Sequence, residues 1–518
     1  MNLTLAEKLA QLMIVRIGSN MPPVRTADED EQRVIDLLAE CPLGGLVLFN
    51  GLHPTSGATL ARVQAASRIP LLVGSDIERG YGQQFRPFPV FPHMMAFDHM
   101  GDAAPAAVRQ FAELTALAAR RAGVHIAFAP VADVNTDPRN PIISTRAFST
   151  QPARGAELTA AAIEGFRAGG LLSCAKHFPG HGDTHQDSHH EMPTVELSAE
   201  ELRGRELLPF KAAIAAGAPL LMTAHVSYPA LDPTRTCATL SRPILTDLLR
   251  GELGYDGAII TDSVLMAGAM EQTTSEPDLC LRALQAGVDL LLDVGDPVAA
   301  VAELEQAVQR GDLPLERVDD AVARVLRLKQ MVLINSEGNI GGAATTPEPD
   351  NETDLQDRTQ AAAAEVAAAA IEVRSGAEHL PLSASQSLLA VLVNPYRSHL
   401  DPDTPELFTA LQERLPHAEC VELRGDESAE RWDELTSRAL AAEQVLAAIV
   451  VKPAAWHHFG LPAAASAWLS DLLPQRAVVL ACLGTPIGLE SLAGARCSLC
   501  TYSDVGASQR ALVECLLG

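Results

Sequence analysis

Short apolar runs alternate with amphipathic stretches through roughly the first two thirds of the chain. Runs of this length are typical of buried β-strands, and the stretches between them have the periodicity of helices. Eight runs can be counted: LMIVRIG (12–18), GGLVLFN (44–50), LLVGSD (71–76), HIAFAPVADV (125–134), LLSCAKH (171–177), LLMTAHV (220–226), AIITDS (258–263) and DLLLDV (289–294). Eight strands, each followed by a helix, predict an α/β fold of the (β/α)8 TIM-like barrel type.

Polar residues stand where these apolar runs end. They are Asp76, Asp133, Lys176, His177, His225, Asp262 and Asp293. The strands of such a barrel end at one common rim, and the active sites of these barrels lie there. We therefore expect the seven side chains to lie close together and to include the functional residues.

A second domain is predicted after a linker. The segment NSEGNIGGAATTPEPDNETD (335–354) is rich in Gly, Thr, Pro and acidic residues and lacks helix or strand periodicity, which is typical of a linker. Beyond it, the apolar runs SLLAVLVNP, VLAAIVV and RAVVLACLG alternate with helical stretches. The pattern predicts a catalytic barrel over 1–334 and a smaller α/β domain over 355–518.

Composition and charge limit the partners. Residues are 47% hydrophobic and 20% charged, and no apolar run approaches the ~18 residues that a membrane span needs, so we expect no membrane partner. The first residues lack a basic leader, which favours a cytoplasmic location. A formal net charge of −26 disfavours binding to nucleic acid. Nine scattered cysteines fit free thiols better than a disulfide framework, and no feature fixes an oligomeric state.

Asp262 is a candidate nucleophile. It follows four apolar residues of a predicted buried strand, so the strand delivers a carboxylate to the rim of the barrel. An aspartate here could equally cap the following helix. A carboxylate that acts as a nucleophile needs a separate proton donor on the other side of the scissile bond.

The stretch KHFPGHGDTHQDSHHE (176–191) can supply that donor. It contains five of the 15 histidines, and Pro179 and Gly180 end the strand and predict a loop. The pair Asp187 and His189 places a carboxylate near an imidazole, which favours acid/base chemistry. The same histidines could instead form a zinc site or an unreactive histidine-rich loop. Four of these histidines recur at every fourth residue, but a Gly-rich loop lacks the helical geometry that would converge the rings on a metal, so we predict neither a metal ion nor another cofactor.

Three long motifs together resemble glycoside hydrolase family 3, specifically its bacterial β-N-acetylglucosaminidase branch. They are KHFPGHGDTHQDSHHE, GAIITDSVLM and APVADVNTDPRNPIISTRAF. The resemblance implies a small carbohydrate substrate and a role in peptidoglycan turnover. It also implies that Asp262 is the nucleophile and that Asp187 and His189 form the acid/base dyad of a retaining mechanism.

The resemblance further implies which residues bind the terminal sugar. Lys176, His177, Arg146 and Asp76 match the family's contacts to sugar hydroxyls. For Asp133 and His225, substrate contact and a purely structural role stay open. The segment SDIERGYGQQF (75–85) departs from the acidic-Gly-Gly-Arg run of the peptidoglycan-recycling enzymes, so glucose is an alternative to N-acetylglucosamine.

The acceptor is a further open question. An imidazole does not repel an anion as a carboxylate would, so inorganic phosphate is an alternative to water, and a phosphorylase is an alternative to a hydrolase. A β-glucosidase, a metal-dependent barrel hydrolase and a non-catalytic sugar-binding protein are also compatible with the sequence.

Overall fold

The computed structural model describes residues 3–184, 192–333, 352–398, 400–454 and 459–518. The chain divides into two compact units. The first comprises Met1–Val90, Pro105–Asp137 and Ala147–Thr359, and the second comprises Phe91–Ala104, Pro138–Arg146 and Gln360–Gly518. The predicted linker at 335–354 falls almost wholly outside the described residues, so the domain boundaries stay a prediction.

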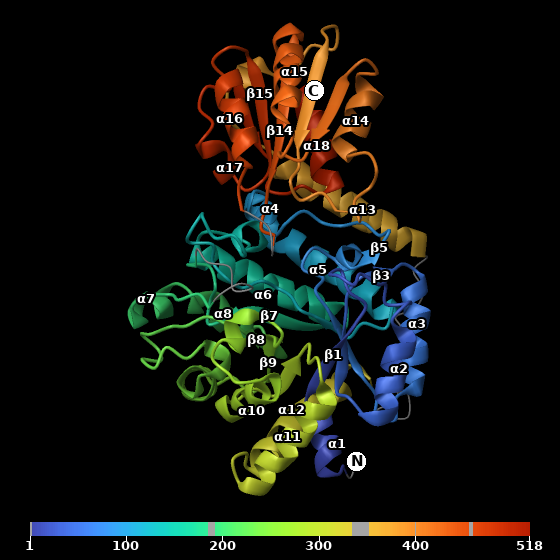
Figure 1. The fold of residues 1–518 in the computed structure, drawn as a ribbon, viewed down its shortest axis with the longest axis vertical. Coiled ribbons are helices and arrows are strands. Elements are labelled where there is room, and N and C mark those ends of the chain that lie inside the picture. Colours follow the sequence, from blue (N-terminus) through green and yellow to red (C-terminus); the bar gives the residue numbers. More distant parts are fainter. Residues whose placement is uncertain (1–2, 185–191, 334–351, 399, 455–458) are drawn as a thin grey trace. The chain divides into compact units, whose positions relative to one another are not determined.

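The first unit contains a closed barrel of eight parallel strands, as predicted (Figure 1). The order around the barrel is β1-β10-β9-β8-β7-β6-β4-β2. The bounds are β1 Met13–Ile17, β2 Gly45–Leu48, β4 Leu72–Ser75, β6 Ile126–Ala127, β7 Leu172–Phe178, β8 Leu220–Thr223, β9 Ala258–Ser263 and β10 Leu290–Leu292. Each strand lies within or against one of the apolar runs, because a strand that is covered on both faces must be apolar throughout.

Helices connect successive barrel strands and surround them (Figure 1). Their bounds are α1 Leu5–Ala10, α2 Glu31–Glu40, α3 Thr55–Ala66, α5 Ala104–Arg121, α6 Pro152–Ala168, α7 Ala199–Gly204, α8 Leu207–Ala215, α9 Ala267–Met270, α10 Glu276–Ala286, α11 Pro297–Arg310 and α12 Leu315–Val332, with a π-helix over Pro243–Glu252. The short strands β3 Gly51–Leu52 and β5 Phe85–Arg86 pair outside the barrel. Ser198 and Glu201 form a capping box at the start of α7.

The second unit is a separate α/β layer structure, which also agrees with the predicted fold class. Its sheet has the order β11-β16-β15-β14-β12-β13, and only β11 is antiparallel to its neighbour. The strands are β11 Glu372–Ser375, β12 Leu388–Val393, β13 Glu419–Leu423, β14 Gln444–Val451, β15 Val478–Gly484 and β16 Cys497–Cys500. The helices are α14 Glu406–Arg414, α15 Ala429–Ala441, α16 Ala463–Leu472, α17 Ile487–Glu490 and α18 Gly506–Leu517. The short helix α4 (Met95–Asp98) belongs to this unit, and α13 (Glu352–Ala369) has residues in both.

Both faces of the second sheet are covered by helices. Alternate residues of β12 point to opposite sides, so Leu392 packs in the core that contains α14 and α18, and Val391 packs in the core that contains α15 and α16. Trp432 and Trp468 lie against each other in the latter core, with ring centroids 5.4 Å apart. The continuous apolar sequence of β12 follows from burial on both faces.

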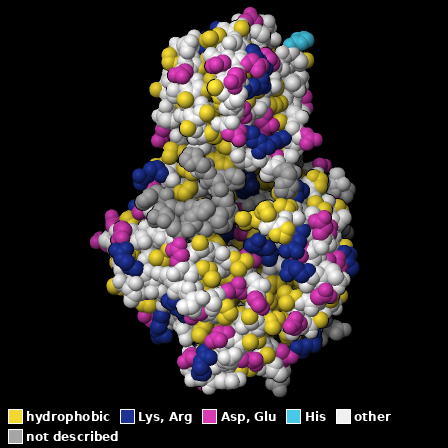
Figure 2. All heavy atoms as spheres, viewed as in Figure 1, with side chains coloured by type: hydrophobic (Ala, Val, Ile, Leu, Met, Phe, Trp, Pro, Cys, Tyr) yellow, Lys and Arg dark blue, Asp and Glu magenta, His cyan; other side chains and the backbone are white. Residues whose placement is uncertain are grey.

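The surface carries charged side chains of both signs. Acidic and basic side chains are interspersed over the face shown in Figure 2. None of the helices formed by the described residues has the length and apolar character required to cross a membrane.

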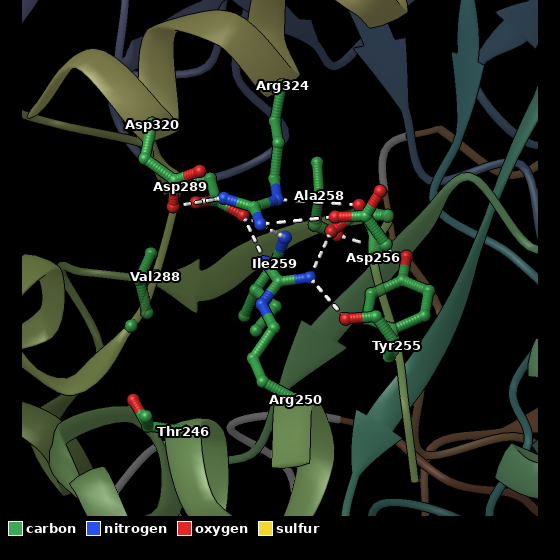
Figure 3. Close-up of polar contacts among 12 residues, drawn as sticks. Thr246, Arg250, Tyr255, Asp256, Ala258, Ile259, Val288, Asp289, Asp320 and Arg324 are labelled. Atoms are coloured by element: carbon green, nitrogen blue, oxygen red, sulfur yellow. Dashed lines mark hydrogen bonds and ion pairs between the residues drawn. The ribbon is translucent and has the colours of Figure 1, made fainter. Parts of the chain in front are cut away.

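A buried carboxylate holds the N-terminal ends of two barrel strands. Asp289 precedes β10 and is completely buried. It accepts hydrogen bonds from Arg250 Nη2 at 2.6 Å, from Arg317 Nη2 at 2.5 Å and from the backbone N–H of Ile259 at 2.9 Å (Figure 3). Arg250 comes from the π-helix and Arg317 from α12. The carboxylate therefore fastens two outer helices to β9 and β10.

We expect Asp289→Asn to lower the free energy of unfolding of the first unit by about 3–5 kcal/mol, because the largely buried guanidinium of Arg250 loses its carboxylate partner and that of Arg317 keeps only the exposed Asp320. Chemical denaturation measures this loss. Asp320→Asn is the matched control, since Asp320 pairs with the same Arg317 but its side chain is 53% exposed. The control should change the free energy of unfolding by less than ~1 kcal/mol, and equal losses in the two variants would contradict a special role of the buried carboxylate.

Candidate active site

Lys176 lies at the rim of the barrel between two acidic side chains. Its β7 backbone is buried throughout, and the side chain is only 3% exposed. Lys176 Nζ lies 2.6 Å from Asp76 Oδ1 and 2.6 Å from Glu78 Oε1. A buried ammonium requires such partners. Asp76 directly follows β4 and is the more exposed of the two acids, at 29%, so it is the one available to a ligand.

Asp133 orients His177. The buried Asp133 carboxylate accepts from His177 Nδ1 at 2.7 Å and from the backbone N–H groups of His177 at 3.1 Å and His181 at 2.7 Å. Burial works against the charge of Asp133, but the imidazole of His177 and the N–H of His181 hold the pKa of its carboxyl below the usual range. Because an ionised carboxylate accepts only, it assigns the proton to His177 Nδ1.

The other nitrogen of His177 faces Asp262. His177 Nε2 lies 4.0 Å from Asp262 Oδ2, and Asp262 Oδ1 accepts the backbone N–H of Ser263 at 2.7 Å. Burial works against the charge of Asp262 too, yet electrostatic interactions with His177, His225 and Lys176 keep the pKa of this carboxyl below its ordinary value. Asp262 is therefore ionised at neutral pH, and its side chain is 22% exposed, so a carboxylate oxygen can reach a ligand.

A second set of contacts fixes the backbone beside Asp262. His225 Nε2 lies 3.0 Å from the carbonyl oxygen of Ser263, and His225 Nδ1 lies 2.7 Å from Thr239 Oγ1. Ser263 Oγ donates to Asp293 Oδ2 at 2.8 Å, and Arg16 Nε donates to Asp293 Oδ1 at 3.0 Å. These contacts hold the end of β9, and thus the direction of the Asp262 side chain.

The structure brings together six of the nine predicted site residues: Asp76, Asp133, Lys176, His177, His225 and Asp262. Both nitrogens of His225 and both oxygens of Asp133 have protein partners, which favours positioning roles for these two residues. Arg146 is the last residue of the 3₁₀ turn Ser144–Arg146 in the second unit, where its Nη1 donates to the carbonyl of Ile142 at 2.9 Å. Asp187 and His189 lie outside the described residues.

Sequence reasoning missed Arg16, Ser263 and Thr239 as members of the site. Arg16 has a visible signal, since it is the single charge in the strand MIVRI, near the strand's C-terminal end. Ser263 and Thr239 have no comparable local signal, because the importance of each comes from a contact with a residue far away in the chain.

A metal centre finds no support among the residues whose placement is described. Within residues 3–184, 192–333 and the later described segments, there is no group of three or more His, Cys, Asp or Glu side chains arranged to hold an ion. The nine cysteines are free thiols, and seven of them are buried.

The sequence was compared with protein families and curated proteins. The model described as the glycosyl hydrolase family 3 N terminal domain matches residues 4–328. Beta-hexosaminidase A of Pseudoalteromonas piscicida is 34% identical over 330 residues, which are 57% of this chain and 54% of that protein. Beta-N-acetylglucosaminidase/beta-glucosidase of Cellulomonas fimi is 30% identical over 341 residues, which are 64% and 58% of the two chains. The chain thus spans between one half and three fifths of these two relatives.

Solved structures agree over the entire chain. A glycoside hydrolase family 3 beta-N-acetylglucosaminidase from Paenibacillus sp. str. FPU-7 superposes with a TM-score of 0.85 at 28% identity and covers 100% of this chain and 97% of its own. Beta-glucoside phosphorylase BglX superposes with a TM-score of 0.84 at 21% identity and covers 100% and 92%. At this lower identity the likeness to the phosphorylase shows the fold alone.

We expect Asp133→Asn to lower the free energy of unfolding by about 2–4 kcal/mol at neutral pH, because the amide cannot replace a buried charge that three N–H groups share. The folded pKa of Asp133 is depressed, so its contribution is present above the unfolded pKa of ~3.9 and is lost as the pH falls through the folded pKa. The deficit of the variant should therefore be constant from about pH 8 to 5 and shrink only below about pH 4. Thermal unfolding of both proteins across this range measures it.

Glu196→Gln provides the control for that series, because it removes a charge from an ion pair with Arg235 in which both side chains are more than half exposed. It should leave stability nearly unchanged at every pH. A deficit of Asp133→Asn that grew on acidification would contradict the assignment of the charge to Asp133.

Proposed function

The chain belongs to glycosyl hydrolase family 3, and from this we propose that it is an exo-acting, retaining β-N-acetylglucosaminidase that removes terminal non-reducing β-linked N-acetylglucosamine. The observation that carries the proposal is the Asp262 carboxylate, ionised and partly exposed at the rim of the barrel beside His177 and Lys176. The names of the two curated relatives and of the Paenibacillus structure support the choice of sugar.

A double-displacement mechanism gives separate roles to Asp262, His189 and Asp187. Asp262 attacks the anomeric carbon while His189, oriented by Asp187, protonates the departing oxygen. His189 then takes a proton from the acceptor that releases the sugar from Asp262, with retention of configuration. The two steps pass through oxocarbenium-like transition states, in which a nearby carboxylate stabilises the positive charge that develops on the ring.

The surrounding residues suit a pyranose. We assign Asp76, Lys176 and His177 to the hydroxyl groups of the terminal sugar, since charged donors and acceptors bind neighbouring hydroxyls in pairs. The shared ammonium of Lys176 leaves the Asp76–Glu78–Lys176 group with one net negative charge, which suits it to accept hydroxyl protons. Asp133 orients His177, and His225 holds the backbone beside Asp262.

A phosphorylase is the second candidate. The specific observation is that the assigned acid/base residue is a histidine, and an imidazole admits an anionic acceptor that a carboxylate would repel. Phosphate would then replace water in the second step and the product would be the sugar 1-phosphate.

The test is turnover of an aryl β-N-acetylglucosaminide and an aryl β-glucoside, each with and without phosphate, with the sugar product identified by mass. We expect release of free N-acetylglucosamine, with Asp262→Asn reduced by at least ~10⁴-fold and His189→Ala by about 10²–10⁴-fold. Glu196→Gln, which removes only one partner of an exposed ion pair with Arg235, should retain full activity.

Other outcomes of the same test decide between the candidates. A sugar 1-phosphate formed at a rate that rises with phosphate would replace the hydrolase by a phosphorylase. Preferential turnover of the glucoside would change the substrate. Full activity of Asp262→Asn in a correctly folded variant would overturn the mechanism.

A further inference from the structure

Glu206 is a buried acid that the proposed mechanism does not use. It lies at the break between α7 and α8, where Arg205 leaves helical geometry with φ −125° and ψ −73°. Glu206 is 0% exposed. Its Oε1 accepts from Arg205 Nε at 2.7 Å, whereas Oε2 is buried and has no hydrogen-bond partner in the described structure. A half-satisfied buried carboxylate is costly and requires a reason.

The reason lies in what Glu206 contacts. The loop that follows β7 begins at Gly180, whose φ is +133°. A Cβ atom at this glycine would lie 2.8 Å from Glu206 Cβ and 2.9 Å from Glu206 Oε2. Glu206 therefore packs directly against the backbone at the start of the loop, which we call the loop root, Gly180–Thr184.

Arg205 extends this support along the loop root. Arg205 Nη2 lies 2.9 Å from Asp183 Oδ1, which also accepts from Thr136 Oγ1 at 3.0 Å. Arg205 is thus shared between Glu206 and Asp183. One guanidinium joins the α7–α8 junction to the fourth residue of the root.

Residues outside the α7–α8 junction also hold the loop root. Tyr228 OH donates to the carbonyl of Gly180 at 2.6 Å, and Asp133 accepts the N–H of His181 at 2.7 Å. The carbonyl of Gly182 accepts the N–H of Asp137 at 3.3 Å. Since Asp133 also orients His177, the root and the rim of the barrel share one anchor.

The charged and titratable groups around Glu206 come from every element packed on it. They are Arg205 at the helix junction, Asp133 beyond β6, Asp183 in the loop root and Tyr228 beyond β8. Burial is the main effect and raises the pKa of Glu206 to about 7, Arg205 acts in the opposite direction, and Asp133 and Asp183 raise it further. The charge on Glu206 consequently changes across neutral pH.

We propose that Glu206 is a positioning residue whose carboxylate, through Arg205 and Asp183, fixes the loop root, from which the chain continues to the assigned acid/base residues Asp187 and His189. When Glu206 is ionised, Arg205 is held between two carboxylates and the loop root is fixed at both ends. When Glu206 is protonated, Arg205 has a single charged partner, Asp183. This inference rests on the proposed function only where it names the proton-donating step.

The kinetic test compares two substrates, only one of which requires protonation of its leaving group. An alkyl or unsubstituted phenyl glycoside requires protonation of its leaving group, whereas a dinitrophenyl glycoside does not. In Glu206→Gln we expect kcat/KM for the former to fall about tenfold at pH 8 and that for the latter to change less than about twofold. A merely structural role would lower both equally, and equal losses would overturn the proposal.

The pH dependence gives a second readout. For the alkyl or phenyl glycoside, we compare kcat/KM of the wild type with that of Glu206→Gln. The ratio should be near 1 at about pH 5 and rise through a midpoint near pH 7, because only the wild type gains the negative charge of Glu206. The ratio of the two kcat/KM values cancels the titration of the assigned acid/base residue His189, which both proteins contain. Glu206→Asp should restore part of this rise. Glu200→Gln, one helix turn or more away on the exposed side of α7, is the control and should match the wild type throughout.

Hydrogen exchange separates the proposal from the assigned function. The amides of 178–184 should exchange at least about fivefold faster in Glu206→Gln than in the wild type at pH 8, with β12 and β14 unchanged. Unchanged exchange at the loop root would overturn the support role. If the wild type cleaved neither glycoside, the proposed function would fail while this measurement would still decide the role of Glu206.

Discussion

The geometry of the candidate site depends on the carboxylate of Asp133. This one buried group accepts the side chain and backbone N–H of His177 and the backbone N–H of His181. It thereby joins the segment after β6 to the end of β7 and to the loop root. A buried carboxylate is stable only with such a full set of donors. Each donor must therefore stay within hydrogen-bonding distance of the carboxylate, which fixes its position.

Carboxylates at the two ends of the barrel differ in how many of their oxygens have protein partners. At the N-terminal end, Asp289 has two close arginines and a backbone N–H, and no side of it is open. At the C-terminal rim, Asp262 has a backbone N–H at one oxygen and a histidine 4.0 Å from the other. The first arrangement leaves no capacity for a ligand, and the second leaves a charged oxygen that a developing positive charge can approach. Asp289 and Asp262 thus differ in how completely the protein satisfies their oxygens.

The sequence predicted the barrel well, because its strands are buried on both faces and appear as uninterrupted apolar runs. The strand-end rule also identified seven rim residues, Asp293 among them, since parallel strands necessarily end together. Contacts between distant residues, such as Arg16 with Asp293, could not be predicted, because local periodicity carries no information on which strand ends become neighbours.

The break between α7 and α8 was not predicted either. Residues 198–217 have a continuous helical pattern. The local signals are Gly204, which is the last residue of α7, and Pro209, which is tolerated because it falls in the first turn of α8. The second unit shows a similar limit. Residues 91–104 and 138–146 belong to it although they interrupt the barrel sequence, and nothing in their composition distinguishes them from ordinary barrel loops.

The helix break has a consequence for how this chain can vary. Arg205 and Glu206 are consecutive, and α7 is only six residues long between its capping box and the break. An α-helix turns by about 100° with each residue. One residue inserted into or deleted from α7 would rotate the guanidinium away from Asp183 or displace the capped start of the helix. The length of α7 is therefore fixed to the residue, and a homologue that has lost or gained one there must support its loop by other side chains.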